Sequence, residues 1–123
     1  MPQTFFPSLR YQDARAAIDF LERAFGFETR AVHENEDGTV AHAEVGLGDQ
    51  MVMLGTDRPD DRWGSHAGMG WIYVAVDDIE ALHARAREAG AEVTDLTDQD
   101  YGSRDFSARD PEGNQWSFGT YRP

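Results

Sequence analysis

The chain has 123 residues, of which 40% are hydrophobic and 11% aromatic, and its 23 acidic and 11 basic residues give a formal net charge of −12. This length predicts one domain over residues 1–123, large enough to bury a core of its own. The sequence contains no cysteine and no lysine. These absences exclude disulfide scaffolds, thiolate metal sites, iron–sulfur clusters, cysteine nucleophiles and lysine Schiff bases.

The charge and the hydropathy pattern also limit the partners and the location that we expect. A strongly acidic domain without a basic cluster repels phosphate backbones and anionic lipid, so neither nucleic acid nor a membrane is an expected partner. The first residues, MPQTFFPSLRYQD, lack the basic start and the apolar stretch of a secretion signal. No run of about 18 apolar residues occurs. The sequence therefore predicts a cytoplasmic protein.

The first half of the chain predicts a strand, a helix and three further strands. The helix is expected between Asp13, as the N-cap, and Gly26, as the C-terminal stop. Its apolar residues recur at helical spacing, namely Ala14, Ala17, Ile18, Leu21 and Phe25. Strand patterns cover residues 4–11, 28–34, 39–47 and 50–54.

The second half repeats this order about 65 residues later. The pattern Asp77-x-x-Glu80 predicts the start of a second helix, and Gly90 predicts its end. Strand patterns cover residues 71–76, 92–96, 104–109 and 115–119. Two similar modules, about 4–54 and 70–120, joined by the loop 55–69, are the simplest explanation of this spacing.

Several short motifs carry a family resemblance. Ala-Phe-Gly-Phe follows the first predicted helix, Val-Asp-Asp-Ile opens the second, and Tyr101-Gly-Ser-Arg-Asp-Phe and Arg109-Asp-Pro-Glu-Gly-Asn-Gln-Trp-Ser-Phe lie near the end of the chain. Together with the duplicated order of elements, they resemble the glyoxalase/bleomycin-resistance/dioxygenase group, the vicinal oxygen chelate superfamily. The resemblance implies an α+β fold in which tandem βαβββ modules form a curved, partly closed eight-stranded sheet around a groove. It also implies a homodimer.

Alternation along the strands predicts which side chains face away from the helices. In the strand over 71–76, Ile72 and Val74 form an aliphatic face, and Trp71 and Tyr73 lie opposite. The faces opposite the aliphatic ones mix aromatic, thioether, hydroxyl, amide and ionisable groups, as a ligand cavity does. The alternative is that they are packed core. The predicted ligand-binding residues are Phe6, Ser8, His42, Glu44, Met51, Met53, Trp71, Tyr73, Gln115 and Ser117, with Trp63 of the connecting loop.

The resemblance also gives an expectation about metal. Metal-dependent members of the family take one ligand from each of four strands, and these positions correspond here to Phe6, Met53, Trp71 and Ser117. None of these side chains is a good ligand for a divalent metal ion. We therefore expect no metal and no other cofactor.

The pair His42 and Glu44 is the candidate for catalysis. Two residues apart on a strand, the side chains point to the same face and could share a proton as general acid or base. Alternatively, the two side chains only hydrogen-bond to each other on a half-exposed sheet and have no role in catalysis. We expect no function for His33, on an outer strand, His66, in the loop, or His83, on the polar side of the second helix.

Three functions remain open at this stage. The leading hypothesis is metal-independent, non-catalytic binding of a small aromatic molecule, either flat and neutral or cationic, similar to the bleomycin-type resistance proteins that sequester a drug. Phe6, Trp63, Trp71 and Tyr73 would stack on the ligand, and Glu44 would favour positive charge. The second is an enzyme of the same fold, a lyase, isomerase or dioxygenase that uses His42 and Glu44. The third is an interaction module whose groove is filled by its own side chains.

Overall fold

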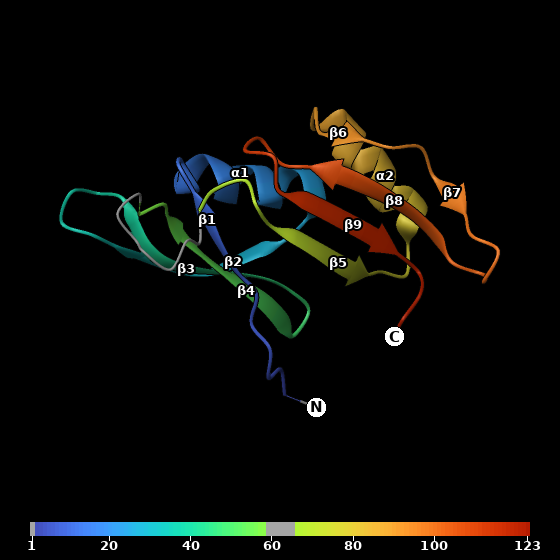
Figure 1. Ribbon diagram of the computed structural model, residues 1–123, viewed down its shortest axis with the longest axis horizontal. Helices are drawn as coiled ribbons and strands as arrows, with labels where there is room; N and C mark the ends of the chain where they lie inside the picture. Colours follow the sequence, from blue (N-terminus) through green and yellow to red (C-terminus); the bar gives the residue numbers. More distant parts are fainter. Residues whose placement is uncertain (1, 59–65) are drawn as a thin grey trace.

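The computed structural model describes residues 2–58 and 66–123, and its elements repeat one order along the chain (Figure 1). The first module consists of β1 (Ser8–Tyr11), α1 (Ala14–Phe25), β2 (Glu28–Glu34), β3 (Val40–Leu47) and β4 (Gln50–Thr56). The second consists of β5 (Trp71–Ala75), α2 (Ile79–Glu88), β6 (Glu92–Val93), β7 (Thr97–Asp98), β8 (Arg104–Arg109) and β9 (Gln115–Gly119). The predicted α+β fold is thereby confirmed.

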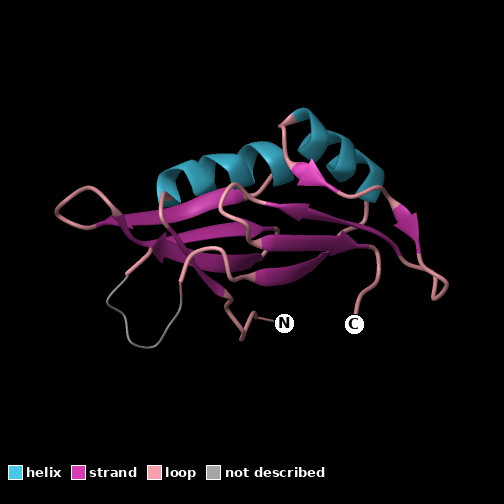
Figure 2. Cartoon of the chain, turned by 45° about the horizontal axis from the view of Figure 1, so that its top comes forward, coloured by secondary structure: helices cyan, strands magenta, loops and turns pink. Residues whose placement is uncertain are grey.

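Each module contributes its own sheet. The strand orders are β1-β4-β3-β2 and β5-β9-β8-β6, and β7 pairs with β8. In each sheet the first strand of the module runs parallel to the last, with Ser8 opposite Met53 and Trp71 opposite Gln115. Figure 2 shows α1 and α2 on the same side of the sheets. We call the other side, which no helix covers in the described part of the chain, the helix-free face.

The helix α1 begins and ends where the sequence predicts. The side chain of Asp13 accepts a hydrogen bond from the amide of Ala16 at 3.1 Å, and Gly26 adopts the left-handed conformation at φ 73° that favours glycine. Arg85 of α2 donates to the carbonyl oxygens of Glu22 and Arg23 at the end of α1, and Glu22 also accepts the amide of Gly26. One arginine therefore ties the two helices together.

The core joins the two modules through α1. The ring of Phe25, at the end of this helix, lies 5.7 Å from the ring of Trp116 and 4.8 Å from that of Phe118, measured between centroids. Both partners belong to β9 of the second module. The aliphatic faces predicted from alternation also lie on the helix side, because Ile72, Val74 and Val76 pack against this core.

The second helix differs from the prediction in two respects. Its N-cap is Asp78, whose carboxylate accepts from the amide of Ala81, whereas Asp77 pairs with Arg122 at 3.2 Å. His83 is buried and not on a polar side. It shares the inner face of α2 with Ile79 and Ala86, at the spacing i, i+4, i+7.

Two predicted strands are shorter in the structure. β1 begins at Ser8, and before it only the carbonyl of Pro7 continues the pairing, to the amide of Met53. Of the strand predicted over 92–96, only β6 (Glu92–Val93) forms, and β7 begins after this range, at Thr97. After β6 the amide of Thr94 still donates to the carbonyl of Ser107, but the amide of Ser107 donates to the hydroxyl of Thr94 and not to its carbonyl, which bonds to His83. Neither helix of the described residues has the length and apolar character needed to cross a lipid bilayer.

Candidate functional site

Four predicted binding residues meet on the helix-free face of the first sheet. The strand register places Ser8 opposite Met53, and Met53 opposite Glu44, in a row across β1, β4 and β3. His42 lies two residues before Glu44 and therefore shares this face. The chain partly buries Met53, Glu44 and His42. The prediction that alternation brings these groups together is thus consistent with the register.

The imidazole of His42 is the partner of the Glu44 carboxylate. Nε2 of His42 lies 2.9 Å from Oε2 of Glu44. The ring of His33 stacks on that of His42, with centroids 6.0 Å apart and an interplanar angle of 23°. In this arrangement each of the two side chains is the hydrogen-bond partner of the other, as the non-catalytic interpretation of the pair expects. The same contact also allows a proton to pass between them.

A hydrogen-bonded group around Trp71 occupies the helix-free face of the second sheet. The indole Nε1 of Trp71 donates to Oγ of Ser117 at 3.0 Å, and Nε2 of Gln115 donates to the same oxygen at 3.2 Å. The hydroxyl of Ser107 lies 3.0 Å from it. Trp71 is held by this contact, yet 72% of its surface is exposed. An oriented and exposed indole is suited to stacking against a planar molecule.

The four positions that correspond to metal ligands in the family do not fit a metal ion here. Phe6 and Met53 offer no oxygen or nitrogen donor, and Trp71 and Ser117 are hydrogen-bonded to each other. Over residues 2–58 and 66–123, no three side chains of histidine, cysteine, aspartate or glutamate are grouped as a metal site requires. No step of chemistry can therefore be assigned to a metal ion at these positions.

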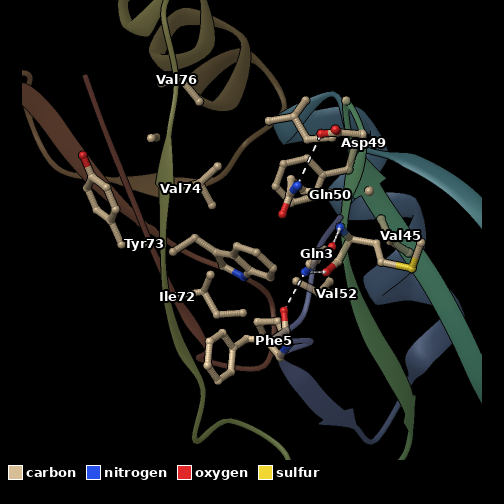
Figure 3. Close-up of a pocket in the computed structure, with 18 of the residues that line it drawn as sticks. Gln3, Phe5, Val45, Asp49, Gln50, Val52, Ile72, Tyr73, Val74 and Val76 are labelled. Carbon is tan, nitrogen blue, oxygen red and sulfur yellow. Dashed lines mark hydrogen bonds between the residues drawn. The ribbon is translucent and has the colours of Figure 1, made fainter. Parts of the chain in front are cut away.

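A cleft of about 910 Å³ lies between the two sheets (Figure 3). Figure 3 shows Ile72 and Val74 of β5 directed into it, and Tyr73 on the other side of the same strand. Val45 and Val52 of the first sheet line the cleft from across, and the buried rings of Phe27 and Trp116 also border it. The cleft is therefore lined mainly by apolar side chains.

The segment before β1 forms part of the wall of this cleft. The side-chain amide of Gln3 accepts from the amide of Met51 at 2.7 Å and donates to its carbonyl at 2.8 Å, as a neighbouring strand would. Phe5 and Pro7 of the same segment also line the cleft, and Phe5 is largely exposed. Asp49 and Gln50 add polar groups at the start of β4.

The predicted residues divide between these places. Met51 lines the cleft, and Tyr73 borders it with its side chain on the other side of β5. The others lie on the helix-free faces of the strands, namely Ser8, His42, Glu44, Met53, Trp71, Gln115 and Ser117. Phe6 is exposed before β1, and Trp63 lies outside the described residues. Sequence reasoning missed Gln3, Phe5 and Trp116 of the cleft. Alternation correctly predicted that Ile72 and Val74 face the helices. It could not predict the cleft between the two sheets, which these residues also line.

The two other histidines have structural partners. Nδ1 of His66 lies 3.4 Å from Oδ1 of Asp57. His83 packs edge-on against Phe106 and hydrogen-bonds to the carbonyl of Thr94 at 2.9 Å. The expectation that neither has a chemical role stays a prediction.

Comparison with known proteins gives a family and several similar structures. A model of the Glyoxalase/Bleomycin resistance protein/Dioxygenase superfamily matches residues 5–118. An uncharacterized protein of Mycobacterium bovis is 36% identical over 121 residues, which span 92% of this chain and 80% of that protein. An uncharacterized protein of Mycobacterium tuberculosis is 36% identical over 121 residues, with 71% of that protein covered.

Three solved structures illustrate the range of this fold. TioX from Micromonospora sp. ML1 has a TM-score of 0.79 at 29% identity, with 98% of each chain covered. TnmS3, an antibiotic binding protein from Streptomyces sp. CB03234, has a TM-score of 0.74 at 21% identity, with 96% of each chain covered. Lactoylglutathione lyase from Agrobacterium tumefaciens has a TM-score of 0.70 at 22% identity, with 96% of this chain and 93% of the lyase covered. Binding proteins and enzymes therefore share the fold, and the side chains of the site must decide between them.

Proposed function

Because the chain belongs to the Glyoxalase/Bleomycin resistance protein/Dioxygenase superfamily, we propose that it binds a small aromatic molecule, without a metal ion and without catalysis. The ligand can carry positive charge, which the acidic surface favours. TnmS3, an antibiotic binding protein of the same fold, supports the proposal of a binding role. The lyase has the same fold, so the fold alone does not exclude catalysis. The proposal therefore rests on the side chains of the candidate site.

The observation that carries the proposal is the exposed indole of Trp71, fixed by Ser117 at a position that corresponds to a metal ligand in the family. An indole at this place removes a metal ligand and adds a stacking surface at the same time. Tyr73 lies two residues further along the same face of β5. On the opposite side of β5, the cleft bordered by Ile72 and Val74 has a volume of about 910 Å³, within the range of about 300–1,000 Å³ that ligand sites usually have.

We also propose that the protein forms a homodimer. Phe5, Met69 and Trp71 are large apolar side chains that the single chain leaves more than two-thirds exposed. Such side chains are commonly covered by a partner or a ligand. A second copy that covers part of the helix-free face would enclose the ligand more than one chain does.

A panel of dyes and antibiotics, screened by thermal shift, tests the binding proposal. A ligand that binds only the folded state raises the melting temperature, and the stabilisation grows with the logarithm of its concentration once this exceeds Kd. Hits are then measured with Trp71→Ala and with Trp71→Phe, which keeps an aromatic ring but loses the hydrogen bond to Ser117. Loss of binding in the first variant and retention in the second would support stacking. Equal affinities of the wild type and both variants would contradict it.

A second candidate function follows from the contact of 2.9 Å between His42 and Glu44. If this pair transfers protons in an isomerase or lyase reaction, His42→Ala abolishes turnover and leaves ligand affinity nearly unchanged. Under the binding proposal, the same variant weakens binding modestly and no turnover exists to be lost. Measuring product formation and affinity for each screened hit separates the two functions.

A further inference from the structure

Three tyrosines gather at one end of the second sheet, next to the group around Trp71. Tyr73 belongs to β5, Tyr101 lies between β7 and β8, and Tyr121 follows β9. The rings of Tyr101 and Tyr121 are nearly perpendicular, at 81°, with centroids 5.9 Å apart. Their exposed fractions are 64% and 51%, and that of Tyr73 is 39%. Two aromatic walls thus meet in a corner that the described chain leaves open.

Hydrogen bonds from two sides fix this corner. The hydroxyl of Tyr73 donates to the carbonyl of Tyr121 at 2.7 Å. The amide of Tyr121 donates to the hydroxyl of Ser103, a residue that is itself buried, at 3.2 Å. The backbone that carries the ring of Tyr121 is therefore anchored to β5 on one side and to the start of β8 on the other.

A glycine allows Tyr73 to lie beside a carboxylate. A Cβ atom at Gly119 would be 2.6 Å from the hydroxyl of Tyr73 and 3.1 Å from Cβ of Asp105, so only glycine leaves room for both. Burial raises the pKa of Tyr73, and the nearby negative charge of Asp105 acts in the same direction. The Tyr73 hydroxyl therefore remains a neutral donor beside an acid.

The carboxylate of Asp105 is not neutralised by a neighbouring base. Oδ1 accepts from the side-chain amide of Gln99 at 3.0 Å. Among residues 2–58 and 66–123, no arginine or histidine forms an ion pair with it, whereas Asp98 nearby pairs with Arg104 and Glu44 with His42. Asp105 thus keeps its charge available to a ligand.

We propose that Tyr73, Tyr101, Tyr121 and Asp105 form a binding site for an N-methylated ammonium group. The faces of aromatic rings attract a cation, and a carboxylate at the edge adds Coulombic attraction. A tetraalkylammonium group suits this site better than a primary amine or a metal ion, because it needs no hydrogen-bond acceptors around it. The inference goes beyond the proposed function, since such a group can bind here without a planar ligand at Trp71.

Choline and its neutral carbon isostere, 3,3-dimethyl-1-butanol, test the inference. Each is titrated at constant ionic strength, and the proton resonances of the tyrosine rings are followed by NMR. We expect choline to shift these resonances in a saturable way and the isostere to bind at least about tenfold more weakly. Similar affinities for the two compounds would overturn the inference. No binding of choline, as in a dimer that covers the tyrosines, would overturn it as well.

Two variants and two controls locate the site. Asp105→Asn and Tyr101→Leu should each weaken choline binding by about three- to thirtyfold, as the loss of a cation–π or charge contact predicts. Asp98→Asn removes the same charge from the same sheet and should have no effect, and Trp71→Ala should leave choline binding intact. An equal loss in Asp98→Asn would indicate general surface charge and refute the site. Thermal melts verify folding, and the exposed Tyr101 keeps the test valid if Asp105→Asn is unstable.

Discussion

The hydroxyl of Tyr11 donates a hydrogen bond of 2.5 Å to the carboxylate of Asp110 and so joins β1 of the first module to the turn between β8 and β9 of the second. The same oxygen of Asp110 also accepts from Nε1 of Trp116 and Nδ2 of Asn114 at 3.2 Å. All four residues are buried. The turn whose Asp-Pro-Glu-Gly-Asn motif carried the family resemblance therefore holds the modules together.

Removing this hydroxyl should destabilise the protein. We expect Tyr11→Phe to lower the free energy of unfolding by about 1–3 kcal/mol, because the buried carboxylate loses a donor. Denaturant titration measures the change. Tyr101→Phe, at an exposed tyrosine, is the control and should alter stability by less than about 0.5 kcal/mol. Equal stabilities of Tyr11→Phe and the wild type would show that the contact adds nothing.

The same tyrosine predicts a loss of stability at high pH. Burial, and then the charge of Asp110, raise the pKa of Tyr11 above its usual value of about 10. Above that pH the hydroxyl ionises in the unfolded chain but stays protonated in the folded one, so stability is complete below pH 10 and falls as the pH rises further. The slope attributable to one such group is at most about 1.4 kcal/mol per pH unit. The difference between wild type and Tyr11→Phe should therefore shrink above pH 10.

Local patterns of the sequence predicted most of the fold. The bounds of β2, β8 and β9 are those expected from alternation, and Asp13 and Gly26 limit α1 as expected. The predictions were wrong where a contact between distant parts of the chain determines the position of a side chain. His83 is polar in type but lies on the inner face of α2, because the carbonyl of Thr94, in the segment between β6 and β7, supplies its hydrogen-bond partner.

The candidate site was less predictable for the same reason. Alternation places Trp71 and Ser117 on one face of their strands. Their hydrogen bond, however, depends on the parallel register that sets Trp71 opposite Gln115. The cleft depends on how two sheets stand relative to one another, which no pattern within a strand encodes. The corner around Tyr101 and Tyr121 likewise brings together two segments outside the strands.

Truncation of Trp71 should affect ligand affinity, whereas truncation of Trp116 should affect stability. Trp71→Ala should leave stability within about 0.5 kcal/mol of the wild type, because its ring is mostly exposed, and should weaken an aromatic ligand by about 1–3 kcal/mol. Trp116→Ala should cost about 3–5 kcal/mol, since this ring is buried among Phe25 and Phe27. Thermal unfolding and ligand titration of both variants provide the comparison. A Trp71→Ala protein that fails to fold would place Trp71 in the core.

The protein should remain free of stoichiometric divalent metal. The positions of Phe6, Met53, Trp71 and Ser117 supply no ligand set, so added nickel, zinc or manganese should not raise the melting temperature. Elemental analysis of protein purified without an affinity tag or chelator measures the content directly. About one metal ion per chain, lost when a residue of the helix-free face is changed, would contradict the prediction.

The last prediction concerns the homodimer. Phe5 is 87% exposed and contributes little to the core of its own chain, so its exposure is explained if a second copy covers it. At micromolar concentration, light scattering should give twice the 13.8 kDa mass of one chain. Phe5→Ser should then shift dissociation to higher protein concentration while leaving the unfolding of the monomer unchanged, because the substitution removes apolar area from the interface and not from the core. Phe6→Ser, at the neighbouring and less exposed phenylalanine, is measured in the same way for comparison. A mass of one chain at every concentration tested would refute the dimer and leave Trp71 of a single chain as the proposed stacking surface.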